Sequence, residues 1–514
     1  MTNALLVAAG ILASRLAGLV RLRVFAHYFG LQSAAADAFN AAFRIPNLLQ
    51  NLFGEGALSA SFIPVYARLI SEGDRRTADR VAGAVAGAMS LIVAVLVLAG
   101  VLLAPVLAAV LAPGFTGAQR ELTVLLVRIL FPGAGVLVLS AWCLGVLNSH
   151  RRFLLSYAAP VIWNAAMIAT LVTFGPSADP PDLAVYLAWG SVAGSVLQLV
   201  VQLPAVWRVA PSLAIGGMVS GHVRAVGRAF LPAFFSRGVV QISAFIDTMI
   251  ATLLPTGAVT GLANAQLIYT LPVSLFGLSV AAAELPAMSG SAGSGAAGFE
   301  VLRDRVNLAL RRVAFFVVPS AVAFLAFGDV IAAALLQTGR FQAGDADYVW
   351  GILAGSSVGL LAATLGRVYS SAYYALRDTE TPLRYALIRV TMGTVLGYLA
   401  ALHGPALFAL DPRWGAAGLT VASGMTAWVE TGLLRTTLGG RVGPVGLPIR
   451  HLATLWALAL TAAAAGWLVR TRVGGWSPVL TAIAVLGVYG GLFLLAAFLA
   501  RIPEVHAIIK RLRR

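Results

Sequence analysis

Long apolar runs recur along the whole chain, and short polar or Gly/Pro-rich breaks separate them. A transmembrane helix needs about 20 apolar residues, and the breaks leave 14 runs of roughly this length or more. Numbered 1 to 14, their approximate cores are residues 4–29, 38–67, 82–111, 122–147, 155–174, 184–206, 229–253, 261–288, 313–336, 349–374, 383–402, 414–433, 451–469 and 479–500. The pattern predicts an all-α integral membrane protein with about 14 transmembrane helices and no large soluble domain.

Composition supports the membrane class. The 514 residues are 59% hydrophobic and 11% charged, whereas soluble domains are about 25% charged. Run 1 carries Ser14-Arg15 and has no small-residue cleavage site after it, so we interpret it as a retained span rather than a signal peptide. The lone Cys143 excludes a disulfide framework, and the six scattered histidines lack metal-ligand spacing. We therefore expect no metal site.

Basic residues alternate sharply between the loops. The loops after even-numbered runs, together with the C-terminal tail, hold 24 arginines and lysines, and the opposite loops hold only 5. Because cytoplasmic loops are enriched in basic residues, both termini are predicted to lie in the cytoplasm. The net charge of +16 is spread over these loops and forms no single patch. This distribution argues against nucleic acid as a partner.

Runs 1, 2 and 7 place charges where a membrane disfavours them, at a cost of about 2.5–3.5 kcal/mol each on insertion scales. Two acids, Asp37 and Glu55, are outnumbered in runs 1 and 2 by four arginines, and run 7 adds a fifth; they are Arg15, Arg21, Arg23, Arg44 and Arg237. This excess suits an anionic ligand, because a guanidinium binds phosphate or carboxylate in bidentate fashion and stays ionised when partly desolvated. Structural alternatives are snorkelling at an end of run 1, an Asp37–Arg44 ion pair, and an interfacial position for Arg237.

Run 2 is expected to be bent or partly unwound. It contains Pro46, Pro64 and the Gly54-Glu55-Gly56 triplet. Irregular backbone at membrane depth is tolerated only where protein covers it or where it lines a wet cavity, and broken helices are common at the substrate sites of transporters. A proline kink used only for packing is the alternative.

Runs 7 and 8 repeat features of runs 1 and 2. Ser14-Arg15 has a counterpart in Ser236-Arg237, and Phe53-Gly54 has a counterpart in Phe276-Gly277. The echo suggests two six-helix lobes of the same orientation, a parallel pseudo-repeat, followed by two C-terminal helices. The predicted domains are an N-terminal lobe (1–210), a C-terminal lobe (211–445), and the last two spans with a basic cytoplasmic tail (446–514).

Several stretches are similar to one family of membrane proteins. DAFNAAFRIPNLLQNLFGEGALSASFIPVYARL (37–69) closely resembles the second-span signature of the MurJ (MviN) lipid II flippases, in the multidrug/oligosaccharidyl-lipid/polysaccharide (MOP) exporter superfamily. SRLAGLVR in run 1, APGFT after run 3, QLPAVWR after run 6 and YYALRDTETP after run 10 fit the same pattern. The resemblance covers essentially the whole chain.

The resemblance implies a flippase rather than an enzyme. Its expected substrate is lipid II, an undecaprenyl-diphosphate-linked muropeptide, whose headgroup crosses to the outer leaflet by alternating access through a cationic central cavity. Helices 13 and 14 would form a groove for the polyprenyl tail. The substrate-binding candidates are four positions that match the family pattern and two added from the charge argument, namely Arg15, Arg21, Asp37 and Glu55, and Arg44 and Arg237. The resemblance also implies a monomer among the lipids of the bacterial cytoplasmic (inner) membrane, and it leaves association with the cell-wall synthesis machinery open.

The chain departs from the family pattern at three places. Leu22 stands where members often have an acid, Gln50 where some have an arginine, and Asn264-Ala265-Gln266-Leu267 lacks an arginine that many carry in run 8. We expect Arg237 to supply the missing charge, with new acidic partners at Asp247 and Glu284.

Other functions remain open. No cofactor is expected, and membrane potential or a coupled H⁺ or Na⁺ would drive transport, with candidate coupling residues at Asp37, Asp247 and Glu284. The alternatives are export of another lipid-linked oligosaccharide and cation-coupled drug antiport, although antiport would favour an acidic and aromatic lining. An enzyme acting on polyprenyl phosphates would need clustered catalytic residues, and none is convincing here. Residues 377–382 after run 10 are either a gating loop or a capped helix start.

Overall fold

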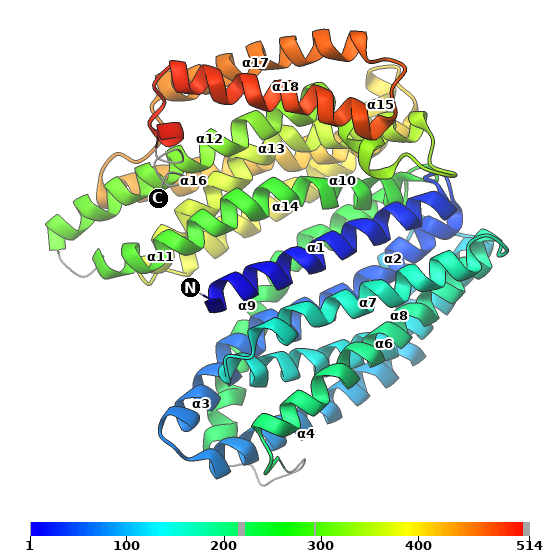
Figure 1. Cartoon of the computed structure of the whole chain (residues 1–514), viewed down its shortest axis with the longest axis vertical. Coiled ribbons are helices and arrows are strands. Elements are labelled where there is room, and N and C mark those ends of the chain that lie inside the picture. Colours follow the sequence, from blue (N-terminus) through cyan, green and yellow to red (C-terminus); the bar gives the residue numbers. More distant parts are fainter. Residues whose placement is uncertain (1, 214–220, 292–294, 507–514) are drawn as a thin grey trace. The chain divides into compact units, whose positions relative to one another are not determined.

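The computed structural model describes residues 2–213, 221–291 and 295–506, and every regular element in these ranges is helical (Figure 1). The predicted all-α class is therefore confirmed. The chain forms two compact units. Unit 1 comprises Met1–Thr260 and the short segment Thr338–Phe341, and unit 2 comprises Gly261–Gln337 and Gln342–Arg514.

Unit 1 contains the helices that correspond to runs 1 to 7. They are α1 (Thr2–Phe29), α2 (Ala34–Leu49), the π-helix η1 (Gln50–Leu58), α3 (Ser59–Ser71), α4 (Arg75–Leu102), α5 (Ala104–Leu111), α6 (Gly117–Ser149), α7 (Phe153–Phe174), α8 (Pro180–Val209) and α9 (Gly221–Ala251). Short polar side chains define two of the starts. The Ser33 hydroxyl accepts from the Ala36 N–H at 3.3 Å before α2, and the Asp74 carboxylate accepts from the Thr77 N–H at 3.0 Å before α4.

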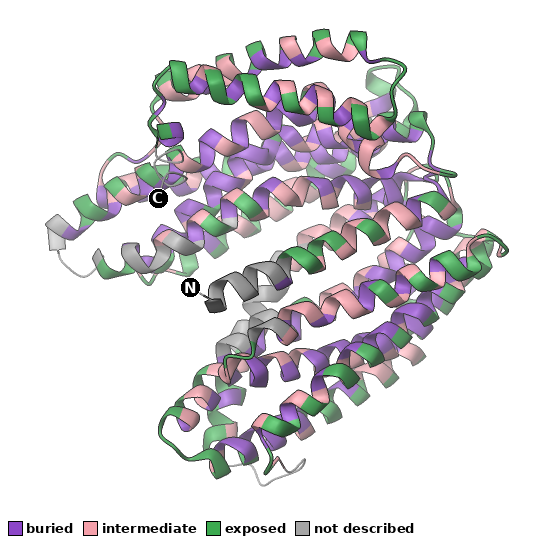
Figure 2. Cartoon of the chain, in the orientation of Figure 1, coloured by how far each residue is buried: buried purple, intermediate pink, exposed green. Residues whose placement is uncertain are grey.

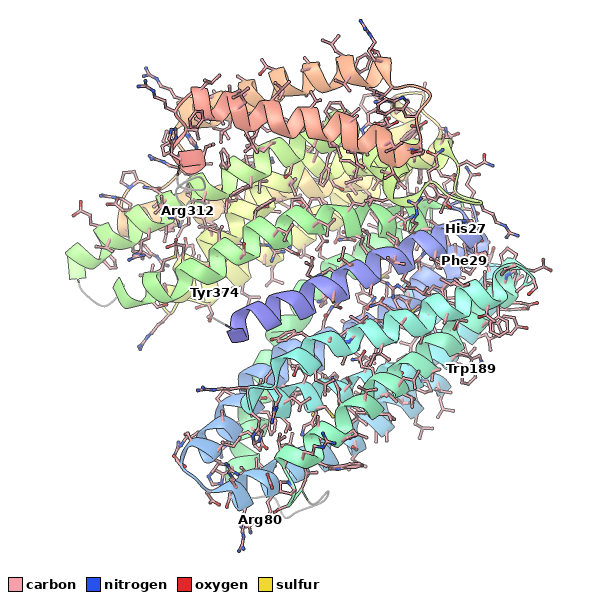
Figure 3. All side chains as sticks on the ribbon, viewed as in Figure 1. His27, Phe29, Arg80, Trp189, Arg312 and Tyr374 are labelled. Carbon is pink, nitrogen blue, oxygen red and sulfur yellow. The ribbon has the colours of Figure 1, made fainter. Side chains whose placement is uncertain are left out.

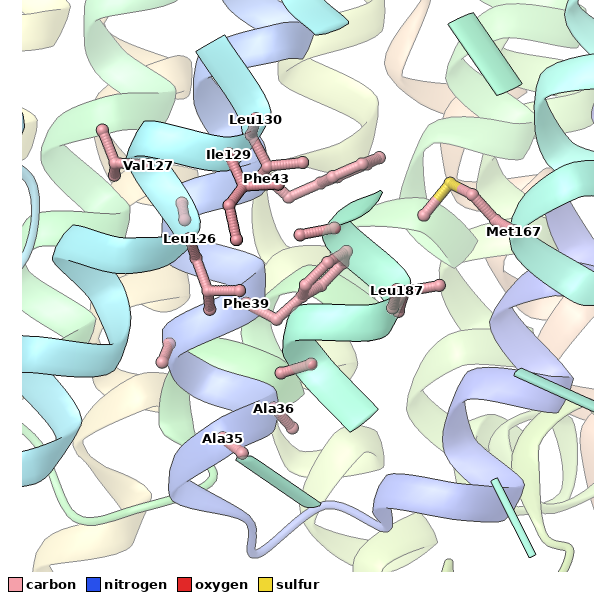
Figure 4. Packing of buried hydrophobic residues seen from close by; sticks show 14 of the residues in the cluster. Ala35, Ala36, Phe39, Phe43, Leu126, Val127, Ile129, Leu130, Met167 and Leu187 are labelled. Carbon is pink, nitrogen blue, oxygen red and sulfur yellow. The ribbon is translucent and has the colours of Figure 1, made fainter. Parts of the chain in front are cut away.

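One hydrophobic core cluster of unit 1 lies where α2, α6 and α8 meet (Figure 4). Phe39 and Phe43 of α2 pack among Leu126 and Leu130 of α6 and Leu187 of α8, and all five side chains are buried. The paired positions on α2 and on α6 are each four residues apart, so one face of each helix is buried. This packing fixes the orientation of α2 and of the polar residues on its other side.

Unit 2 contains the helices of runs 8 to 14. They are α10 (Ala258–Pro272), the π-helix η2 (Val273–Leu278), α11 (Ser279–Ser291), α12 (Gly295–Leu336), α13 (Ala343–Ala375), α14 (Glu380–Leu402), α15 (Gly404–Leu407), the 3₁₀-helix η3 (Pro412–Trp414), α16 (Gly415–Val442), α17 (Ile449–Arg472) and α18 (Pro478–Leu499), with the first residues of α10 counted in unit 1. Small residues bring α13 and α16 together. A Cβ on Gly359 would lie 2.4 Å from the Cα of Gly424, and such small-residue contacts are typical of helix packing in membranes.

The chain returns to unit 1 for the short segment between α12 and α13. The Arg340 N–H donates to the carbonyl of His27 at 2.9 Å, and His27 Nδ1 lies 2.8 Å from the Thr338 hydroxyl. Figure 3 shows His27 near the end of α1. The segment is therefore anchored to α1 by both backbone and side-chain bonds.

Ten helices in the described ranges are long and apolar enough to cross a bilayer. Each of the predicted runs falls on one helix or on consecutive helical segments, while their number, 14, stays a prediction. Exposed residues, green in Figure 2, recur along α17 and α18. Leu468, Ile483 and Leu499 are 70%, 65% and 70% exposed, and exposed apolar faces of this kind mark contact with lipid.

The irregularity predicted in run 2 is a π-helix. η1 joins α2 to α3 and contains Leu52-Phe53-Gly54, and η2 joins α10 to α11 and contains Leu275-Phe276-Gly277. The two sequence stretches that echo one another therefore both lie in widened helical turns, which are rare and concentrate at functional sites. The backbone stays helical in both, so run 2 is widened rather than unwound.

The predicted domain limits have a different basis from the observed units. The compact units separate at Thr260/Gly261, inside α10, whereas the predicted lobes 1–210 and 211–445 and the segment 446–514 follow the sequence echo. Compactness reports contacts rather than repeats, so these domain limits stay a prediction.

Candidate functional site

Arg21 of α1 rests on two aromatic rings. Its guanidinium carbon lies 5.1 Å from the ring centre of Phe43 and 5.6 Å from that of Trp163, and its Nη1 lies 3.4 Å from Met167 Sδ. The two rings stack 5.5 Å apart with 11° between their planes. The Trp163 Nε1–H donates to the carbonyl and hydroxyl of Ser191 at 3.0 and 3.1 Å. The surface under the guanidinium is thus fixed by α2, α7 and α8.

Arg21 has no carboxylate partner among the described side chains. Its contacts there are the two rings and the thioether, and none of these groups carries a full negative charge. Cation–π contacts hold a guanidinium in place but leave most of its five N–H donors unused. The arrangement therefore presents a half-buried positive charge to an incoming anion. Phosphate and carboxylate match its bidentate geometry.

The other predicted arginines are placed differently. Arg15 lies six residues before Arg21 on α1 and is exposed. Six residues correspond to a rotation of about 240° around an α-helix, so the two side chains project from different sides and are not brought together. The side chains of Arg237 and Glu55 lie outside the described residues, and their expected roles stay predictions.

One face of α2 carries Asp37, Asn40 and Arg44 at the spacing i, i+3, i+7. The Asn40 Nδ2–H donates to the Thr260 hydroxyl at 3.1 Å. Arg44 interacts electrostatically with Asp247 of α9. Asp247 is therefore an acidic neighbour of Arg44, and its expected partnership with Arg237 stays a prediction.

Asp37 is buried, and its carboxylate caps the start of α10. The Gly257 N–H donates to Oδ2 at 2.7 Å, and Thr260 donates to Oδ1 from its N–H at 2.8 Å and from its hydroxyl at 2.6 Å. The carboxylate also faces the positive end of the helix dipole. Gly257 has a φ of +96°, and a Cβ there would lie 3.2 Å from the carbonyl of Leu31, so glycine is required. The geometry gives Asp37 a capping role; its expected contact with substrate or a coupling ion stays a prediction.

Glu284 of α11 has two partners on α12. Its Oε1 lies 2.7 Å from Arg312 Nη1, and its Oε2 lies 3.6 Å from Arg305 Nη1; Arg312 is labelled in Figure 3. Two guanidinium groups therefore face this carboxylate, and its expected partnership with Arg237 stays a prediction. The expected role of Glu284 in ion coupling stays a prediction.

Comparison with known proteins decides the family. The family model described as lipid II flippase MurJ matches residues 25–487. The chain belongs to the MurJ family. The resemblance seen in the motifs of runs 1 and 2 is thereby confirmed.

MurJ relatives align over most of the chain. "Probable lipid II flippase MurJ" of Rhizobium tropici is 32% identical, covering 98% of this chain and 95% of that protein. "Lipid II flippase MurJ" of Burkholderia cenocepacia is 32% identical, covering 84% and 82%. Among solved structures, a MurJ in an inward closed conformation has a TM-score of 0.77 at 22% identity, covering 97% of this chain and 99% of that one. An inward-facing multidrug MATE transporter of the MOP superfamily has a TM-score of 0.66 at 18% identity, covering 83% and 95%. These two structures share the fold.

The MurJ motifs do not reveal which side chains support Arg21. Phe43 lies inside the run-2 signature, but Trp163 and Met167 come from α7 and belong to none of the recognised motifs.

The ion pair between Arg389 and Glu430 was likewise not predicted from the sequence. The loop count places Arg389 on the cytoplasmic side after run 10, whereas it lies inside α14 with its Nε 3.2 Å from Glu430 Oε2. The sequence signal for this ion pair is Glu430, because an acid inside an apolar run needs a positively charged partner.

The MurJ-like stretch after run 10 contains a helix cap. Asp378 Oδ1 accepts from the N–H groups of Glu380 and Thr381 at 3.1 and 3.0 Å, and Oδ2 accepts from the Thr381 hydroxyl at 2.7 Å and from Arg441 Nη1 at 2.6 Å. The capping interpretation of residues 377–382 is confirmed. Burial alone would raise the pKa of Asp378, but the hydrogen bonds from Thr381 and Arg441 outweigh it and lower the pKa to about 2.

Asp378→Asn is expected to destabilise the chain at neutral pH and much less in acid. Because the folded pKa of about 2 lies below the ordinary 3.8, the ionised carboxylate stabilises the fold above about pH 4, and this contribution disappears as the pH falls toward 2. At pH 7 the loss should be about 1–2 kcal/mol, since solvent weakens a partly exposed group. Thermal unfolding in detergent across a pH series measures it. A difference between variant and wild type that stays constant from pH 7 to pH 3 would contradict the assignment.

Proposed function

We propose that this chain is a lipid II flippase. The family match and the names of its relatives support this function. The structural observation that carries it is Arg21, a guanidinium held on Phe43 and Trp163 without a described carboxylate partner. The diphosphate of a polyprenyl-linked substrate supplies the negative charge that this arrangement lacks. A site for a cationic drug would instead present acids.

Transport is proposed to follow alternating access, with the headgroup moving from the cytoplasmic to the outer leaflet. The chain acts as a transporter rather than an enzyme, as a monomer in the bacterial cytoplasmic membrane, with both termini in the cytoplasm. The concentration of basic residues in the loops after even-numbered runs and in the C-terminal tail supports this orientation. Membrane potential or a coupled H⁺ or Na⁺ drives the cycle without a cofactor.

The test is complementation followed by reconstitution. In bacteria depleted of their resident lipid II flippase, expression of the intact chain should restore most of the lipid II that is accessible on the outer face. Purified chain in liposomes should likewise expose lipid II to an external probe, faster than it exposes other lipid-linked oligosaccharides. Failure of well-folded protein in liposomes would refute the assignment. Failure in cells alone would leave the liposome result to decide.

A further inference from the structure

A polar cluster spans four helices of unit 2. Arg389 of α14 and Glu430 of α16 form an ion pair, with Nε and Oε2 3.2 Å apart. Arg367 of α13 interacts electrostatically with both of these residues and with Tyr269 of α10. All four belong to unit 2. They are separated by up to 161 residues in the sequence, so only the fold brings them together.

The charges of this cluster do not balance. It contains two guanidinium groups and one carboxylate, and Glu430 lies at ion-pair distance from Arg389. The Glu430 side chain is 14% exposed and the Arg389 side chain 30%, so this pair is turned inward. Arg367 is exposed and makes no hydrogen bond or ion pair with a described side chain. Arg367 therefore carries the uncompensated charge.

The cluster lies well inside its helices. Arg367 precedes the end of α13 by eight residues, and Arg389 follows the start of α14 by nine, distances of about 12 and 14 Å along the helix axes. Both helices are apolar enough to span a membrane. An ionised side chain at such a position normally faces a water-filled space or a charged ligand.

Arg367 also packs against the π-helix of unit 2. A Cβ on Gly277 of η2 would lie 3.8 Å from Arg367 Cδ and 2.5 Å from Thr364 Cγ2. The absence of a side chain at Gly277 therefore lets α13 approach the widened turn and bring the arginine to it. π-Helical turns are over-represented at functional sites. The aliphatic part of Arg367 is thus held by the helix, while the residue as a whole remains accessible.

We propose that Arg367 of α13 binds a phosphate group of the transported lipid, an inference that rests on the proposed function. Glu430 neutralises Arg389, so Arg367 alone presents a free charge. Tyr269, which interacts electrostatically with Arg367, carries a hydroxyl that can donate a hydrogen bond to the same phosphate oxygens. The site is a substrate-binding position that no motif of runs 1 and 2 contains.

The experiment measures binding of undecaprenyl diphosphate to the purified full chain in lipid nanodiscs. Arg367→Gln should weaken binding about 10-fold. Arg367→Lys should weaken it less, because lysine keeps the charge but loses the bidentate fork. Glu430→Gln should tighten binding several-fold by freeing Arg389. The control is Arg384→Gln, which removes an exposed arginine paired with Glu380 in the first turns of α14, and its affinity should stay within twofold of wild type.

Wild-type affinity in a folded Arg367→Gln variant would overturn the inference, and so would an equal loss with Arg384→Gln, which would report only the net charge of the chain. Weaker binding by Glu430→Gln would assign the carboxylate to the ligand and also overturn it. Failure of the proposed function is distinguishable. If binding depends on Arg367 but no lipid II is exposed in liposomes, the flippase assignment fails and the site stands. If lipid II is exposed normally and Arg367→Gln binds as wild type does, the site fails and the function stands.

Discussion

Lipid II transport should fall about 100-fold when Arg21 is replaced by alanine, while the chain keeps its fold. Hydrogen bonds to charged groups contribute about 1.5–3 kcal/mol each, so loss of two to a diphosphate corresponds to at least this factor. Phe43 and Trp163 contact one another directly, so the packing beneath the guanidinium should survive. The rate of lipid II exposure in liposomes, at matched protein levels, measures the effect.

The matched control for Arg21 is another arginine stacked on a tryptophan. Arg413 lies 5.6 Å from the ring centre of Trp414, but it also has an acidic neighbour, Asp411, at 3.7 Å. Arg413→Ala should leave transport within twofold of wild type, and Arg21→Lys should fall between wild type and Arg21→Ala. Transport by Arg21→Ala within about threefold of wild type would show that the stacked guanidinium is not a substrate contact.

Asp37→Ala should lower the free energy of unfolding by about 3–5 kcal/mol. The substitution leaves three donors of Gly257 and Thr260 without their acceptor, and an unsatisfied buried donor costs about 1–3 kcal/mol. The site is 2% exposed, so water cannot easily replace the carboxylate. Unfolding of the purified chain, followed by temperature or denaturant, measures the loss.

The exposed helix cap at Asp74 is the control that separates the effect of burial at Asp37 from the effect of losing any helix cap. Asp74 accepts from the Thr77 N–H at the start of α4 and is exposed, so Asp74→Ala should destabilise much less than Asp37→Ala. Asp37→Asn keeps one acceptor but turns an N–H group toward donors, and its loss should be intermediate. Equal losses at Asp37 and Asp74 would show that burial of the three bonds contributes nothing.

The helices could be predicted because their causes are local. Apolar length, the Pro and Gly residues of run 2 and the Asp-Thr cap before α14 act over a few neighbours. The sequence echo between Phe53-Gly54 and Phe276-Gly277 likewise marked both π-helices. The repeated residues could not specify a π-helical backbone, because the same residues also suit a kink or an unwound segment.

The contacts of the candidate site could not be predicted, because they join distant parts of the chain. Asp37 and Thr260 are 223 residues apart, and nothing near either position in the sequence indicates the other. The absence of an arginine at residues 264–267 pointed to Arg237 as a replacement. Arg367 is an alternative replacement that hydrophobic periodicity could not suggest. It lies on α13 but interacts electrostatically with Tyr269 of α10, the helix that contains residues 264–267.

The paired π-helices bear on the ancestry of the chain. A π turn holds more residues than the α turn it replaces, so it arises when an insertion is accommodated within an existing helix. η1 and η2 both contain Leu-Phe-Gly, and two independent insertions would have had to occur at the same step of equivalent helices. If the two lobes are the predicted repeat, a single insertion that preceded their duplication accounts for both. The copies then diverged in chemistry, since Glu55 follows the glycine in one and Leu278 follows it in the other.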